Sequence, residues 1–247
     1  MYDAVLAETI TITGDGGDAV EAYLARPLDP GPRGGVVVIH HMPGYDAATK
    51  EITRRFAVLG FNACCPNLYH REAPGASPDD AAASARALGG VSDDRLVGDV
   101  AGAAAVLRGL TSANRKVGVI GYCSGGRQAF LAGCRLPLDA VVDCYGAFVA
   151  TSTPPEAPFS RPAVIGLAAG LAGPVLGLFG AEDQHPSPAE TAELERVLTE
   201  LGTPHELHTY EGAGHAFFAV DRPSYRPEAA GDGWSRIADW FGRYLAA

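Results

Sequence analysis

Six residues near the middle of the chain combine a nucleophile with the small neighbours that an exposed nucleophile requires. They read Gly121-Tyr122-Cys123-Ser124-Gly125-Gly126, after an apolar run at 116–120 and before a helical pattern at 127–132. A nucleophile at the apex of a sharp strand-to-helix turn has a strained backbone, so the residues two positions away on each side must be small. Centring the turn on Cys123 places glycines at both positions. Cys123 is therefore the candidate nucleophile.

The alternative frame, centred on Ser124, would put Tyr122 at a position where a ring does not fit. With Cys123 at the apex, the backbone N–H of Ser124 becomes a candidate donor to an oxyanion. A chance glycine-rich turn around a structural cysteine is the other interpretation. The strand before the turn and the helix after it favour the catalytic one.

A thiol nucleophile needs a base, and the base needs an acid to orient it. On a strand-turn-helix scaffold of this kind, the chain order is nucleophile, acid, histidine. Asp183 directly follows an apolar run and His215 lies in a glycine-rich loop near the end, so both fit this order. Glu182 competes for the role of acid. Asp183 as a turn residue and His215 as a surface histidine are the alternatives.

The segment after the run at 35–40 carries two adjacent histidines and the second candidate oxyanion donor. Pro43 has no N–H, so the backbone N–H of Met42 is the candidate. His40 and His41 would point to opposite faces of an extended strand, which argues against a shared metal. We expect His41 to face Cys123. A hydrogen-bonded structural histidine is an equal alternative.

Composition excludes several classes of protein. The 247 residues carry a formal net charge of −10 and are 47% hydrophobic. Nucleic-acid binding needs basic clusters, and the sequence has none. It also has no apolar run long enough to cross a membrane and no N-terminal signal pattern. We expect a single domain over 1–247 with no nucleic-acid or membrane partner.

The five cysteines indicate free thiols in the cytoplasm. Their number is odd and no Cys-x-x-Cys pair occurs, which argues against a disulfide framework and a structural zinc site. The other four lie in apolar segments and are predicted to be small core residues: Cys64, Cys65, Cys134 and Cys144.

Apolar runs alternate with helical patterns along most of the chain, which is typical of a doubly wound, mostly parallel sheet flanked by helices. The segment 67–80 is predicted to be a loop, and 146–169 an irregular stretch over the site. Strands are expected at 5–13, 19–25, 35–40, 61–65, 116–120, 138–145, 174–179 and 205–210. Helices are expected at 48–59, 94–110, 188–201 and 234–245, besides the one after the turn.

Together these motifs resemble the dienelactone hydrolase family, cysteine hydrolases of the α/β-hydrolase superfamily. The resemblance runs from about residue 35 to the C-terminus. It includes Gly-Tyr-Cys-x-Gly-Gly at 121–126, Cys-Pro-Asn-Leu-Tyr at 65–69, Gly-Asp-Val at 98–100, Asp183, and Gly-His-x-Phe at 214–217. It implies an α/β-hydrolase fold, a triad of Cys123, Asp183 and His215, and oxyanion donors Met42 and Ser124.

The sequence departs from the family pattern at two places. Dienelactone-cleaving members carry a glutamate near the place of His41, where it holds the resting thiol, so His41 is expected to modulate the thiol instead. Those members also bind the substrate carboxylate through two arginines. In this sequence the position of one of these arginines is occupied by Ala219. Arg86 lies near the other, and Arg86, Tyr145 and Phe217 are the candidate substrate contacts. A more neutral ester or lactone is therefore expected.

The expected function is hydrolysis of a small ester or lactone through an acyl-thioester, without a metal or an organic cofactor. The expected assembly is a monomer or a small homo-oligomer. Two other classes of function are kept as alternatives. One is a redox-reactive thiol protein based on Cys123, and the other is a non-catalytic binding protein on the same fold.

Overall fold

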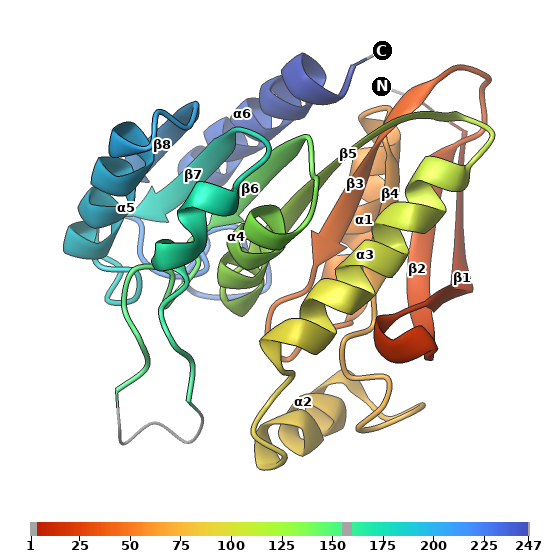
Figure 1. Ribbon diagram of the computed structural model, residues 1–247, viewed down its shortest axis with the longest axis horizontal. Coiled ribbons are helices and arrows are strands. Elements are labelled where there is room, and N and C mark those ends of the chain that lie inside the picture. Colours follow the sequence, from red (N-terminus) through yellow and green to blue (C-terminus); the bar gives the residue numbers. More distant parts are fainter. Residues whose placement is uncertain (1–3, 155–159, 247) are drawn as a thin grey trace. The chain divides into compact units, whose positions relative to one another are not determined.

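The computed structural model describes residues 4–154 and 160–246. They form two compact units, one of Met1–Val119 with Leu245–Ala247 and one of Ile120–Tyr244. Figure 1 colours the chain from its N-terminus to its C-terminus. The segment 155–159, part of the predicted irregular stretch, lies outside the described residues. The expectation of a single domain stays a prediction.

The first unit is built on strands that are antiparallel at one edge and parallel further in. Strands β1 (Val5–Thr13) and β2 (Ala19–Pro27) pair antiparallel, and β2 pairs antiparallel with β4 (Asn62–Pro66). Strand β3 (Arg33–Ile39) is parallel to β4. Every residue of β3 and β4 is buried, as expected for strands that are covered on both faces.

Helices α1 (Ala47–Val58) and α3 (Asp93–Gly109) lie on opposite faces of these strands (Figure 1). Each begins at a side-chain cap, since Asp46 accepts from the Thr49 N–H and Ser92 from the Arg95 N–H. Helix α2 (Pro78–Ala87) begins inside the segment predicted to be a loop. Ser77 caps it and Pro78 takes its first position, where the missing N–H costs nothing.

Strand β5 (Ala113–Tyr122) begins in the last residues of the first unit and ends in the second. Strands β6 (Ala140–Cys144), β7 (Val175–Gly180) and β8 (His205–Tyr210) follow in parallel. The strand order is β1-β2-β4-β3-β5-β6-β7-β8. This mostly parallel sheet with flanking helices is the predicted α/β-hydrolase fold.

Three helices complete the second unit: α4 (Ser124–Arg135), α5 (Pro188–Glu200) and α6 (Pro227–Leu245). A capping box starts α5, in which Ser187 and Glu190 satisfy each other's backbone N–H groups. Helix α6 begins seven residues before the predicted start at 234, with a proline in its first turn. Two short 3-10 helices lie at Asp15–Gly17 and Ile165–Gly170.

The Gly-Asp-Val motif at 98–100 has a structural role in the first unit. Asp99 is fully buried, accepts a hydrogen bond from the Asp15 N–H and binds Arg71 through both oxygens at 2.9 Å. Gly98 leaves room for Asp15, because a Cβ at position 98 would overlap that residue. The motif thus ties α3 to the turn between β1 and β2.

Within the described ranges 4–154 and 160–246, no helix has both the length and the apolar composition that crossing a membrane requires.

Candidate active site

Cys123 lies between the end of β5 and the start of α4, with backbone angles φ 58° and ψ −122°. A non-glycine residue rarely adopts a positive φ, so the surrounding backbone must hold this conformation. The Cys123 N–H donates to the Cys144 carbonyl at 3.0 Å, and the Cys123 carbonyl accepts from the Gly126 N–H at 2.9 Å. A Cβ at Gly121 would overlap the Gly125 carbonyl. The absence of a side chain at Gly121 therefore permits the turn to close.

Replacing Gly121 with alanine is expected to destabilise the protein by about 3 kcal/mol or more, because the new methyl group meets rigid backbone. Urea unfolding followed by circular dichroism measures this loss. Gly242→Ala is the matched control, since Gly242 lies exposed in α6 with open space where its Cβ would be. That variant should change stability by less than about 1 kcal/mol, in the favourable direction. Equal stabilities for the two variants would contradict the steric argument.

Asp183 and His215 meet at the carboxyl ends of the strands in the same unit. The Asp183 Oδ2 lies 2.8 Å from the His215 Nδ1. The other carboxylate oxygen of Asp183 accepts from the His185 backbone N–H at 2.9 Å, and the side chain is 2% exposed. Both oxygens of the Asp183 carboxylate are therefore held in place, and the carboxylate in turn fixes the orientation of the His215 ring.

The Cys123 side chain lies close enough to His215 to act on the pKa of its ring. Burial is the largest influence on the His215 pKa and lowers it, but the interactions with Asp183 and Cys123 together outweigh burial. The pKa of His215 is raised to about 10. A histidine with a raised pKa is charged through neutral pH, and a charged imidazole beside a thiol favours the thiolate. The structure thus brings Asp183 and Cys123 to the same imidazole, and their action as a triad stays a prediction.

Tyr145 and Phe217, two of the candidate substrate contacts, lie in an aromatic cluster behind His215. The Tyr145 ring meets the His215 ring edge-on at 5.2 Å and the Phe217 ring at 5.2 Å. Tyr145 is 3% exposed and Phe217 is fully buried. In this structure Tyr145 packs against His215 and Phe217 packs against Tyr145, and their contact with substrate stays a prediction.

A cavity of about 390 Å³ lies beside His215. Phe148 and His185 form one side of it, with their rings stacked at 5.4 Å. Asp183 and His215 line the same cavity. Its position next to the imidazole makes it a candidate place for the part of a substrate that carries the leaving group.

The two adjacent histidines of the first unit have different surroundings. His40 is buried, with its Nδ1 2.9 Å from the His41 carbonyl, and its Nε2 accepts from the Leu68 N–H. Burial lowers the His40 pKa to about 4, so this residue is a neutral structural histidine. The His41 Nε2 instead lies 3.1 Å from Asp46, partly exposed. His41 thus contacts the residue that caps α1, and its proposed action on Cys123 stays a prediction.

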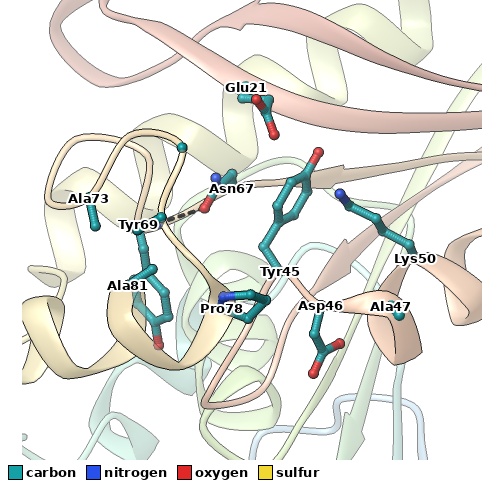
Figure 2. Close-up of a pocket in the computed structure, with 12 residues that line it drawn as sticks. Glu21, Tyr45, Asp46, Ala47, Lys50, Asn67, Tyr69, Ala73, Pro78 and Ala81 are labelled. Atoms are coloured by element: carbon teal, nitrogen blue, oxygen red, sulfur yellow. Dashed lines mark hydrogen bonds between the residues drawn. The ribbon is translucent and has the colours of Figure 1, made fainter.

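Figure 2 shows a second cavity, of about 310 Å³, in the first unit near the start of α1. Tyr45 points toward Glu21, and the Lys50 Nζ lies 4.2 Å from the centre of the Tyr45 ring. Asn67, from the Cys-Pro-Asn-Leu-Tyr motif, accepts from the Tyr69 N–H at 3.2 Å. The motif therefore shapes the loop after β4 that forms one wall of this cavity.

Met42 and Arg86 also belong to the first unit. Met42 is partly exposed in the loop after β3, and Arg86 is exposed on α2. Their roles toward an oxyanion and a substrate stay predictions, as does that of the Ser124 N–H at the first turn of α4. In the part of the chain that the structure describes, no group of three or more histidine, cysteine or acidic side chains is placed to hold a metal ion.

The other four cysteines are buried free thiols. Burial raises the pKa of Cys64 and of Cys134 to about 12, and it holds the pKa of Cys65 and of Cys144 well above the ordinary value of a thiol. A thiol with a raised pKa is a poor nucleophile at neutral pH. Cys123 is the one cysteine with partial exposure.

Two residues near the site were not singled out from the sequence. The His185 N–H holds Asp183, and its ring lines the cavity. Asp143 lies fully buried beneath the first turn of α4. A single acidic residue within an apolar strand was the signal that could have drawn attention to it.

The sequence profile of the Dienelactone hydrolase family matches residues 20–245. The chain belongs to this family. A carboxymethylenebutenolidase of Rhodococcus opacus is 29% identical, over 90% of this chain and 86% of its own. A Methylorubrum extorquens protein, provisionally given the same name, is 34% identical over 92% of this chain and 78% of its own.

Solved structures of the dienelactone hydrolase family agree with this assignment. A Klebsiella pneumoniae protein provisionally described as a dienelactone hydrolase superposes with a TM-score of 0.85 at 28% identity, covering 98% of this chain and all of that one. The chain described here is thus a hydrolase of the lactone and ester class, on the fold that its sequence predicts.

Proposed function

We propose that this family member hydrolyses esters or lactones through a triad of Cys123, His215 and Asp183 and an acyl-thioester on Cys123. The observation that carries the proposal is the unbroken set of contacts from the Asp183 carboxylate through the His215 ring to the Cys123 thiol. The strained apex position of Cys123 supports it, because such turns present a nucleophile at the sheet edge.

In the first half of the proposed reaction, the Cys123 thiolate attacks the carbonyl carbon and the carbonyl oxygen takes up the negative charge. The backbone N–H groups of Ser124 and Met42 stabilise this oxyanion. The tetrahedral intermediate collapses, the carbon–oxygen bond of the ester breaks, and His215 gives its proton to the departing alkoxide.

In the second half, neutral His215 takes a proton from water, and the resulting hydroxide attacks the thioester carbon. The carbon–sulfur bond breaks, the acid leaves, and Cys123 returns as a thiolate beside protonated His215. Asp183 keeps the imidazole in one tautomer throughout both halves.

A rapid-mixing assay with a nitrophenyl acetate tests this function. We expect a burst of nitrophenol equal to the enzyme concentration, followed by slower turnover, since the acyl-thioester forms before it is hydrolysed. Rapid oxidation of Cys123 by peroxide without ester turnover would favour a redox role. Binding of esters without any burst would favour a non-catalytic role.

The substrate we propose is neutral near its reacting bond, because position 219 is alanine where carboxylate-binding relatives carry arginine. A panel of matched lactones with and without a carboxylate tests this choice. The cytoplasm is the compartment we propose, since all five cysteines are free thiols. A monomer or a small homo-oligomer remains the proposed assembly.

We further propose that His41 raises the reactivity of the resting Cys123. A glutamate in its place would carry a negative charge that disfavours a nearby thiolate, whereas histidine does not. His41→Glu should therefore slow the labelling of Cys123 by iodoacetamide at neutral pH, measured by mass spectrometry against pH. His41→Gln, which adds no charge, is the matched control. An unchanged or faster rate in His41→Glu would show that His41 does not act on the thiol.

A further inference from the structure

A carboxyl group lies buried beneath the turn that holds Cys123. Asp143, near the end of β6, is fully buried. Its Oδ1 accepts a hydrogen bond from the Gly146 N–H at 2.8 Å. Its Oδ2 has no hydrogen-bond partner among residues 4–154 and 160–246. Burying a carboxyl group while one of its oxygens has no hydrogen bond lowers the stability of the fold. This cost points to a role of Asp143 in the site.

Asp143 fills the space between the first turn of α4 and the turn that follows β6. A Cβ at Gly126 or at Gly146 would overlap its Oδ1, so both glycines leave room for the carboxyl. The next residue on β6, Cys144, accepts the hydrogen bond of the Cys123 N–H. Asp143 is thus packed against the backbone that carries Cys123 on two sides.

The same carboxyl holds the residue that supports His215. The turn closed by Asp143 and Gly146 contains Tyr145, which has a positive φ of 43°. This conformation directs the Tyr145 ring edge-on against His215. The Tyr145 ring also lies 6.1 Å from the ring of Phe218, beyond His215 in the chain. The turn therefore holds Tyr145 against the His215 ring and limits the movement of the imidazole.

The protonation state of Asp143 matters because its surroundings supply little compensation for a charge. Burial raises its pKa to about 7, although the Gly146 N–H works in the opposite direction. The titratable and charged groups of the elements packed against it are Cys123 just before α4, Arg127 on α4, and its chain neighbours Cys144 and Tyr145. The Arg127 side chain donates instead to the Pro162 carbonyl, and the β7 partner of Asp143, Gly177, has no side chain.

We propose that Asp143 is a positioning residue whose neutral carboxyl braces Cys123 and His215, and whose ionisation opposes the negative charge that develops at Cys123 during the reaction. This inference rests on the proposed function. A negative charge in a desolvated place beneath the first turn of α4 destabilises both a thiolate and an oxyanion at that turn. Ionisation of Asp143 therefore slows acylation on the alkaline side of neutrality.

The test compares kcat/KM for a nitrophenyl ester from pH 5.5 to 8.5 in the native protein and in Asp143→Asn. The carboxamide oxygen can still accept from Gly146, but it cannot ionise. We expect the ratio of variant to native kcat/KM to rise about tenfold between pH 6 and pH 8, because only the native enzyme acquires the charge. Asp143→Ala lacks the acceptor as well, and should lose more than about tenfold at every pH.

Asp139→Asn is the matched control, because it makes the same change just before the start of β6, where the side chain is partly exposed. Its ratio to the native enzyme should stay constant with pH. A constant ratio for Asp143→Asn, or an equal rise for Asp139→Asn, would overturn the inference. If Asp143→Asn does not fold, Asp143→Ser carries the same test, since its hydroxyl also accepts without ionising. Activity of Cys123→Ala in the same assay would instead refute the proposed function itself.

Discussion

Cys123→Ala is expected to abolish ester hydrolysis, with turnover falling at least about 10⁴-fold, because the residue that forms the acyl intermediate is gone. Backbone strain at position 123 does not depend on sulfur, so the variant should fold. Turnover of a nitrophenyl ester measures the loss, and circular dichroism checks the fold. Mass spectrometry of the native enzyme with a slow substrate should show an acyl group on the peptide that contains Cys123.

The other cysteines provide the controls for this result. Alanine at Cys134 or Cys144 removes a buried thiol with a raised pKa and should leave turnover largely intact once stability is taken into account. The same holds for Cys64 and Cys65. An acyl group found on Ser124 instead of Cys123 would show that the frame of the turn was chosen wrongly.

Asp183→Asn is expected to keep the fold and to lower kcat by about 10³- to 10⁴-fold. An amide at this position can present its NH2 group to His215 Nδ1, which selects the wrong tautomer and removes the charge that supports the imidazolium. The variant should also lower the His215 pKa, because the Asp183 hydrogen bond is one of the contacts that raise it. Turnover and an NMR titration of the imidazole measure the two effects.

Glu182→Gln is the control for the acid, since Glu182 is the neighbouring carboxylate and lines the same cavity. It should retain most of its activity. Near-normal turnover of Asp183→Asn together with an inactive Glu182→Gln would mean that the acid is Glu182.

The sequence was most informative where the constraint was local. The turn around Cys123 needs glycines at fixed offsets, and continuous apolar runs such as 35–39 have few alternatives to a buried parallel strand. Helix α2 was missed because it is short and alanine-rich, with a weak apolar periodicity next to a proline-rich loop. Its start depends on the Ser77 cap rather than on any face that the pattern reveals.

The sequence did not identify residues whose role depends on contacts with residues far away along the chain. Alternation along a strand separates His40 from His41 but does not say which one is buried, and the Leu68 N–H decides that question in the fold. The position of Asp143 depends on Gly126 and Gly146, which approach it only after β6 has been placed beside α4. Periodicity carries no information about such packing.

The aromatic cluster behind His215 also gives the enzyme an optical probe of its own. The chain has two tryptophans. Trp234 lies edge-on to Phe218 at 6.0 Å, while Trp240 is buried against Tyr244, further along α6. Phe218 in turn lies 4.7 Å from Phe217, in the loop that carries His215. The emission of Trp234 should therefore respond to changes in the loop that carries His215, while that of Trp240 should report on α6, and neither needs an added label.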